Sequence, residues 1–168
     1  MAATEALVQR STSAPIPVVP WRDPHEVAPA DLQAHIERLE RACLDHPQSA
    51  DLRTCLGMAH AMNYDVYKSI DALEAATTLD PTHFWAQMKY AELHFRLRAL
   101  IRAEEETKKA LELADTPWQL AVARKQLQEI RRLARDSARN VAFNKPLAAP
   151  ALVLSLMLLV TFVAMSWK

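Results

Sequence analysis

Glycine is nearly absent from this chain of 168 residues, since Gly57 is the only one. Loops that cradle phosphate groups need several glycines at fixed spacing, so the P-loop and the dinucleotide-binding GxGxxG loop are excluded. The sequence is instead rich in Ala, Leu, Glu, Gln, Lys and Arg, which are strong helix formers. We therefore expect an all-α protein.

Cysteine is scarce too, and Cys43 and Cys55 are the only two. Two cysteines are too few for a disulfide framework and do not form a pair with metal-ligand spacing. We therefore expect reduced thiols in a cytosol-like compartment. Residues 1–20 contain no apolar core of signal-peptide length, so export through an N-terminal signal is not expected.

Prolines divide the chain into an arm and a helical region. Five of them fall before residue 30, which predicts a flexible or extended Pro-rich arm over residues 1–30. A helical domain is predicted over 31–139, with Asp31 as the expected N-cap of its first helix. Its six helical patterns, separated by short breaks, cover 31–46, 49–63, 66–81, 82–97, 101–115 and 116–140.

The helical region repeats itself at a fixed offset, which aligns Gly57 with Ala91 and Ala76 with Ala110. This offset matches the period of about 34 residues, with two helices per unit, that is the signature of the tetratricopeptide repeat (TPR). Full units span 50–83 and 84–117, and the helix before them fits the second half of a preceding unit.

The first unit resembles the TPR family in several positions. Leu56 and Gly57 occupy the family's Leu-Gly pair, Ala76 its small residue and Pro81 its usual stop, whereas Ser69 stands where the family prefers alanine. The resemblance implies a short α-solenoid of about six helices with one concave face. Small residues let the two helices of a hairpin approach closely, so a side chain at Gly57 would push them apart. The alternative is an unrelated helical bundle.

A closing helix is predicted over 118–139, because a stack of repeats must cover its exposed end with a polar-faced helix. The helix carries one apolar stripe that we expect to face the stack. The stripe consists of Leu120, Ala123, Leu127, Ile130 and Ala134.

TPR domains bind peptides or helices, and the resemblance implies the same for the concave face here. Methionine suits an apolar partner because it repacks around different shapes. The predicted partner-binding residues are the inner positions of the first helix of each unit: Met58, Met62, Trp85, Met88, Glu92, Phe95 and Arg96. Alternatively, the methionines and Phe95 simply pack between helices.

A C-terminal carboxylate of a partner and the chain's own Pro-rich segment are two further candidate ligands of the concave face. Some TPR domains clamp a C-terminal carboxylate with Lys, Asn and Arg, but Thr54, Met58 and Lys89 do not reproduce that pattern. Recognition of chaperone tails is therefore not expected. The Pro-rich segment 14–24 is tethered nearby and would have a high effective concentration in the groove. A disordered leader is the favoured alternative for this arm.

Catalytic motifs such as HExxH and the nucleophile elbow are missing from the sequence. His60 and His94 lie one unit apart, about 10 Å from each other judged by helix packing distances. No third ligand recurs with them, so a packing role is favoured. We expect no enzyme, no cofactor, no metal site and no small-molecule substrate.

The C-terminal residues form the longest uncharged run, from Leu147 to Trp167. About 20 apolar residues are needed to cross the hydrocarbon core of a bilayer as a helix. We therefore predict a transmembrane helix over 147–167, joined to the domain by a linker over 140–146. A buried helix of a soluble domain is the alternative.

Basic residues precede this run, namely Arg132, Arg135, Arg139 and Lys145, and only Lys168 follows it. That asymmetry favours keeping the helical domain on the cytosolic side, and the cations can contact anionic headgroups. Nucleic acid is not expected as a partner, because the remainder of the domain is acidic.

The order of parts (arm, six helices with two central repeats, C-terminal anchor) is similar to the mitochondrial fission adaptor family. It implies a single-pass, tail-anchored protein, in an organelle outer membrane or equally in a bacterial inner membrane. We expect a scaffold that recruits a protein partner. The alternative is a structural or assembly subunit of a larger membrane complex, in which Ser155, Thr161 and Ser166 assist packing between spans.

Overall fold

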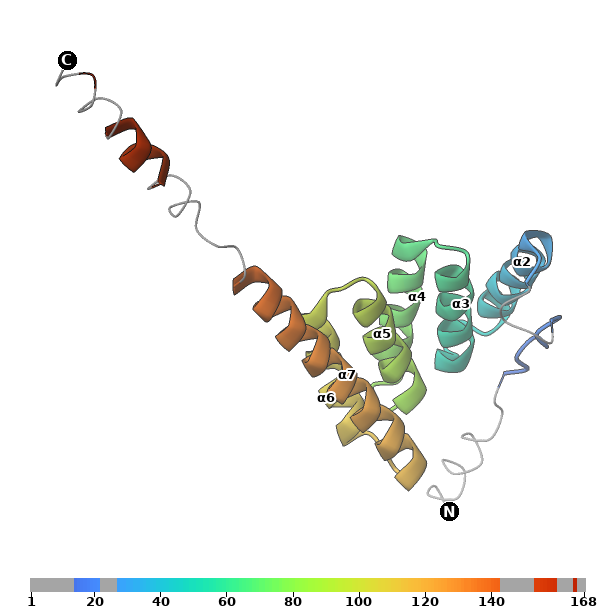
Figure 1. Cartoon of the computed structure of the whole chain (residues 1–168). Helices are drawn as coiled ribbons and strands as arrows, with labels where there is room; N and C mark the ends of the chain where they lie inside the picture. The colour runs from blue at the N-terminus through green and yellow to red at the C-terminus, as the bar shows by residue number, and fades with distance from the viewer. Residues whose placement is uncertain (1–13, 22–26, 143–152, 160–164, 166–168) are drawn as a thin grey trace. The chain divides into compact units, whose positions relative to one another are not determined.

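The computed structural model describes residues 14–21, 27–142, 153–159 and 165, without the side chains of 139–142. The chain divides into two compact units, Met1–Ile130 and Arg131–Lys168, and each is described by itself. All regular secondary structure in the described residues is helical, which confirms the all-α prediction (Figure 1). The labelled helices are α2 (Pro29–Asp45), α3 (Ala50–Met62), α4 (Val66–Leu79), α5 (Phe84–Arg96), α6 (Leu100–Glu112) and α7 (Pro117–Ala142).

The first helix starts earlier than the sequence predicts. Helix α2 has Ala28 as its N-cap and Pro29 in its first turn, so the prediction that Asp31 is the N-cap is wrong. Proline suits this position because its fixed φ matches the helix and the first N–H groups have no partner within the helix. Asp31 lies in the first turn, where its charge favours the helix dipole.

Helices α3 and α5 have side-chain caps. Ser49 Oγ accepts a 3.3 Å hydrogen bond from the N–H of Leu52, and His83 Nδ1 accepts one of 2.9 Å from Ala86. His83 Nε2 also lies 2.7 Å from Asp51 Oδ1 on α3. His83 therefore joins the starts of two consecutive units.

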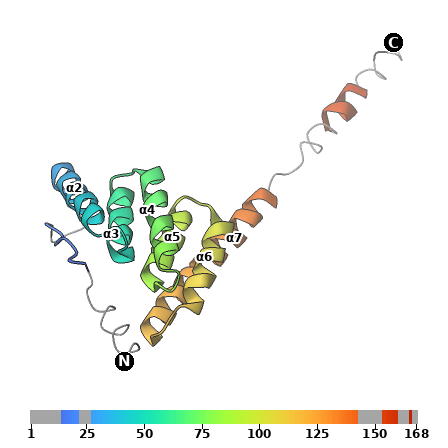
Figure 2. The same cartoon turned by 180° about the vertical axis from the view of Figure 1, so that it is seen from behind.

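The helices of Met1–Ile130 pack as a stack of antiparallel hairpins, α3 with α4 and α5 with α6. Helix α2 packs on α3, and α4 packs on α5 (Figure 2). Helix α3 also contacts α5, whereas α4 and α6, both fully described, do not contact each other. The first helices of the units thus lie together on an inner face, and the second helices stand apart on an outer face.

Close packing of the first hairpin depends on Gly57, as the sequence predicts. A Cβ atom at this position would lie 2.6 Å from Leu73 Cγ on α4, well inside van der Waals contact. Leu73 is buried, and so are the small residues Ala76 and Ala110 of the second helices. A larger side chain at Gly57 would displace Leu73 from the core.

Helix α7 covers the end of the stack through its predicted stripe. Ala123, Leu127 and Ile130 are buried. Ala123 packs in one cluster with Ala110, and Gln126 Nε2 donates a 3.1 Å hydrogen bond to Thr107 Oγ1. Helix α7 therefore runs antiparallel to α6. It spans 117–142, beyond the predicted 118–139, and so includes part of the predicted linker.

Most of the predicted span 147–167 lies outside the described residues. Within it, 153–159 are helical and their apolar side chains are exposed. Among the residues that the structure describes, no helix is both long enough and apolar enough to cross a bilayer. The spanning helix stays a prediction from the sequence.

The described part of the Pro-rich arm, 14–21, is extended and partly packed. Ala14 and Trp21 contact the apolar cluster built by α2 and α3. The Trp21 ring meets His35 of α2 edge-on, with centroids 5.2 Å apart. This segment of the arm therefore binds the first helix of the stack, instead of forming part of a disordered leader. The other arm residues, 1–13 and 22–26, lie outside the described residues.

Candidate partner-binding face

The inner face carries exposed side chains at equivalent positions of neighbouring helices. Met62 ends α3 and Arg96 ends α5, and both are exposed. Met58, Trp85 and Phe95 are half-buried. These five predicted residues lie on the two helices that contact each other, so α3 and α5 together form one surface.

Met88 differs from the other predicted residues, because its side chain is only 4% exposed. It packs with Phe84, Ala110 and Ala123 at the junction of α5, α6 and α7. Met88 therefore packs between helices and is not part of the exposed inner face. Thr54, one turn into α3, is likewise buried, and its hydroxyl donates a 2.8 Å hydrogen bond to the carbonyl of Ala50.

Glu92 forms ion pairs with two basic residues of its own helix, α5. Its carboxylate lies 2.8 Å from Lys89 Nζ and 2.6 Å from Arg96 Nη2. Burial works against the ionised form, but the hydrogen bonds and charges of Lys89 and Arg96 outweigh it, so the pKa of Glu92 is lowered. Glu92 is therefore ionised at neutral pH and holds the Arg96 guanidinium along the helix.

An aromatic cluster lies at the start of α5 and α7. Phe84 and Trp85 meet edge-on with ring centroids 4.9 Å apart, and Trp85 lies 5.3 Å from Trp118. Trp118 is 64% exposed. Trp118 was not predicted from the sequence, although it stands one repeat period after Phe84 and therefore opens the next repeat in the register.

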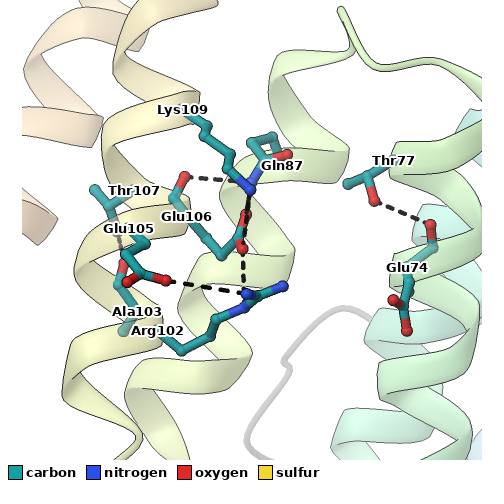
Figure 3. Close-up of polar contacts among 9 residues, drawn as sticks. All are labelled: Glu74, Thr77, Gln87, Arg102, Ala103, Glu105, Glu106, Thr107 and Lys109. Atoms are coloured by element: carbon teal, nitrogen blue, oxygen red, sulfur yellow. Dashed lines mark hydrogen bonds and ion pairs between the residues drawn. The ribbon is translucent and has the colours of Figure 1, made fainter.

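A cavity of about 420 Å³, which was not predicted from the sequence, lies between α4 and α6. Glu106, 2% exposed, is its central group (Figure 3). Its carboxylate accepts a 2.6 Å hydrogen bond from Gln87 Nε2 and pairs with Arg102 Nε at 2.9 Å and Lys109 Nζ at 3.0 Å. Glu106 aligns with Ala72 of the first unit. A carboxylate at a repeat position that is apolar in the other unit is the sequence feature that could have indicated this cluster.

The Glu106 carboxylate, the main charged group of this cavity, is already paired with Arg102 and Lys109. Hydrogen bonding with Tyr90 and the charge of Glu106 raise the pKa of Arg102. On the α4 side, Thr77 Oγ1 donates to the carbonyl of Glu74 at 2.9 Å (Figure 3). The arrangement ties α5 to α6, because Gln87 comes from one helix and Glu106 from the other.

His60 and His94 both pack against neighbouring side chains. His60 is buried, with Nδ1 3.6 Å from Asp65 Oδ2 and Nε2 4.0 Å from Glu40 Oε1 of α2. His94 meets the Tyr90 ring edge-on at 4.6 Å, and burial, followed by the charge of Arg102, lowers the pKa of its imidazole. In the described part of the chain, no three His, Cys, Asp or Glu residues are placed to share a metal ion.

The basic residues that the sequence predicts near a membrane belong to the unit Arg131–Lys168. Arg132 and Arg135 are exposed, and Arg135 Nε donates to the carbonyl of Arg131 at 3.2 Å. The Arg139 side chain and Lys145 lie outside the described residues. The two described cations are therefore accessible to solvent or to a charged surface.

Comparison with known proteins identifies the fold. No family model matches the chain, and no curated protein matches it. The first TPR of Spaghetti (RPAP3), bound to the HSP90 peptide SRMEEVD, is similar with a TM-score of 0.56 and 17% identity, covering 63% of this chain and 82% of that one. The Sgt2 TPR domain from Aspergillus fumigatus gives 0.57 and 17%, covering 66% and 72%. The TPR protein TTC0263 of Thermus thermophilus gives 0.54 and 18%, covering 76% and 73%.

These likenesses establish that the helical stack has the TPR fold. The repeat register of the sequence and the Gly57 contact agree with that assignment. At such low identity the likeness concerns the fold alone.

Proposed function

We propose that this protein is a membrane-anchored adaptor that binds a peptide or helix of a protein partner along the inner face of α3 and α5. The observation that carries the proposal is the exposure of Met62 and Arg96 at equivalent ends of two helices in contact. An apolar side chain beside a fixed guanidinium suits an amphipathic segment with a carboxylate on its polar side.

The aromatic cluster extends this surface toward the other end of the inner helices. Trp85 and Trp118 offer rigid apolar area, and large aromatic side chains dominate the energy of many protein interfaces. A partner helix lying across α3 and α5 would use the indoles at one end and Arg96 at the other.

The partner differs in chemistry from the ligands of the RPAP3 domains. Those TPR domains are described with the HSP90 peptide SRMEEVD and the HSP70 peptide SGPTIEEVD. Here Thr54 is buried and Met58 has no polar hydrogen to donate. Neither side chain is available to clamp a C-terminal carboxylate, so an internal apolar segment of the partner is favoured.

The anchor of the proposed adaptor is the uncharged run from Leu147 to Trp167. Arg132 and Arg135, together with Arg139 and Lys145, precede the run. The positive-inside rule then keeps the TPR domain in the cytosol.

The binding face is tested with the full chain reconstituted in nanodiscs and used to capture partners from the cytosol of its own cells. Trp85→Ala and Arg96→Glu should each weaken capture at least about tenfold, which corresponds to the loss of roughly 1.4 kcal/mol. Lys108→Glu on the outer helix α6 is the matched control and should capture normally. Unchanged capture by both inner-face variants would eliminate this face.

The anchor is tested by alkaline extraction of membranes that contain the full chain. Leu154→Arg combined with Leu159→Arg should release the chain, because an arginine near the centre of a span costs about 2.5–3.5 kcal/mol on insertion scales. Leu44→Arg, at an exposed position of α2, is the control and should leave the chain in the membrane. Release of the unaltered chain by alkali would contradict the anchor.

A further inference from the structure

Large apolar side chains gather at one edge of the helical stack. The edge holds the turn between α3 and α4 and the turn between α5 and α6, with the residues that flank them. Exposed fractions there run from 37% to 90% for five residues: Met62, Tyr64, Tyr67, Leu97 and Ile101. We call this surface the turn edge. So many apolar side chains on two adjacent turns are more than the scatter expected for a monomer surface.

The two turns have the same backbone conformation. Tyr64 and Arg98 occupy equivalent positions of the two units and have φ angles of 61° and 62°. A tyrosine in this left-handed region costs about 1–2 kcal/mol, which glycine or asparagine would avoid. Tyr64 is nevertheless 90% exposed, so its ring adds no packing inside the fold in return. Stability of the domain gives no reason for a tyrosine at this position.

The opposite edge of the stack has a different composition. The turns between α2 and α3 and between α4 and α5 cover 46–49 and 80–83, which read HPQS and DPTH. The exposed apolar residues near that edge are Leu44 on α2 and Trp118 on α7, at the two ends of the stack. The two edges are therefore unlike, because among the described residues the large exposed hydrophobic side chains on neighbouring turns lie at the turn edge.

The turn edge is also basic. Residues 62–68 and 96–102 contain four cations and one acid, Asp65. Arg96 and Arg102 pair with Glu92 and Glu106, so Lys68 and Arg98 are the cations that this edge offers to a charged surface. The Asp65 carboxylate already accepts a 2.8 Å hydrogen bond from Asn63 Nδ2. Tyrosine, aliphatic residues and cations together match the headgroup region of a bilayer, where aromatic side chains with one polar end accumulate.

The chain leaves the first unit at this same edge. Helix α7 runs antiparallel to α6, which begins at the turn edge, so Ile130 lies at the turn-edge end of the stack. Residues 131–146 then lead to the uncharged run that starts at Leu147. Residues 131–142 belong to α7 and span about 18 Å as a helix, and four further residues add at most about 14 Å. A bilayer holding the run would thus stay within reach of the turn edge.

From these observations we propose that the turn edge rests on the headgroup region of an anionic bilayer, with Tyr64, Tyr67 and Ile101 in the interface. The proposal deepens the adaptor function and rests on the proposed anchor. Contact through this edge leaves the inner face of α3 and α5 open to the cytosol, with Met62 and Arg96 at its membrane end. A partner helix would bind with one end near the lipid.

The test places an environment-sensitive fluorophore on the full chain in vesicles that contain phosphatidylserine. The label is attached through Tyr67→Cys, or through Ile101→Cys as a second site, in a background with Cys43→Ala and Cys55→Ala. Leu44→Cys, equally exposed at the opposite edge, is the matched control. We expect blue-shifted emission and quenching by nitroxide lipids for positions 67 and 101, and neither effect at position 44.

Charge is tested in the same vesicles with Arg98→Ser. Loss of one cation near an anionic surface should reduce the lipid-bound population of the label about fivefold. Vesicles of phosphatidylcholine alone should also reduce it.

The possible results separate this proposal from the anchor. A chain that resists alkaline extraction while position 67 stays in water overturns the turn-edge proposal and leaves the anchor standing. A chain that alkali removes overturns both. Equal shifts at positions 44 and 67 would mean non-specific adsorption, and a shift at 67 that requires an added protein would make the edge a protein interface. Either result rejects lipid binding by the turn edge.

Discussion

Ser69 Oγ on α4 donates a 2.7 Å hydrogen bond to the carbonyl oxygen of Gly57 on α3. Ser69 is fully buried, and the Leu73 side chain fills the space where a Cβ of residue 57 would lie. The backbone of α3 at Gly57 therefore meets the Ser69 and Leu73 side chains of α4 directly, which a side chain at position 57 would prevent. This contact sets the spacing of the first hairpin.

Gly57→Ala should destabilise the full chain in mild detergent by about 1–3 kcal/mol, the usual effect of overpacking a core. Alanine's helix preference of about 1 kcal/mol over glycine offsets part of this loss. Urea denaturation followed by circular dichroism measures the change. Ala91→Gly at the equivalent buried position of α5 is the comparison, and it should lose the propensity difference plus about 0.8 kcal/mol for its buried methyl group. If Gly57→Ala made the chain more stable, the hairpin would have space for a methyl group at position 57, and the close contact with Leu73 would be contradicted.

Glu106→Ala should destabilise the chain by about 1–3 kcal/mol, because the buried Gln87 amide loses its carboxylate acceptor and keeps only the 3.3 Å hydrogen bond to the carbonyl of residue 106. Arg102 and Lys109 are half-exposed and can turn to solvent, which limits the loss. Thermal unfolding measures it. Glu105→Ala, one residue away and exposed, should change stability by less than about 0.5 kcal/mol. Equal effects from both variants would contradict the network in Figure 3.

Glu92→Gln should change how stability depends on pH. The pKa of Glu92 in the folded chain lies below its ordinary value of 4.5, so the ionised form stabilises the fold above that pH. This contribution is lost as the pH falls through the lowered pKa. Denaturation curves between pH 7 and pH 3 should show the variant less stable at pH 7 and the difference shrinking below pH 4.5. A difference that grows in acid would refute the assignment.

Arg132→Ser combined with Arg135→Ser should lower the fraction of chains that insert with the helical domain on the cytosolic side. The reason is that basic residues close to a span determine its orientation. Protease protection of membranes containing the full chain measures this fraction. Arg124→Ser with Lys125→Ser, farther from the span, is the control and should insert like the parent. If the first pair behaved like the control, these cations would have no part in orientation.

Much of the fold was predictable from local signals. The repeat register depends on small residues at fixed positions, and Gly57, Ala76 and Ala110 are buried as the pattern requires. The buried stripe of α7 followed from its apolar spacing, because amphipathicity reports directly which side meets the core. The early start of α2 was missed, since a proline in the first turn is as good a start signal as an acidic cap.

The candidate face was less predictable, because burial at an inner position depends on the neighbouring helices. Met62 and Met88 are both methionines of first helices, yet Met62 ends α3 in solvent whereas Met88 faces α6 and α7. Only the packing of three helices distinguishes them. The Glu106 network was missed for a similar reason, since its partners Gln87 and Arg102 come from different helices.

The most direct test of the adaptor account is photocrosslinking from the inner face of the full chain in its own membranes. A benzophenone amino acid replaces Met62 or Arg96 on the inner helices, and Lys108 on α6 as the control. The account predicts that positions 62 and 96 form an adduct with the same protein, and that Trp85→Ala abolishes it while position 108 gives none. Equal adducts from position 108, or adducts at 62 and 96 that survive Trp85→Ala, would contradict recruitment through this face.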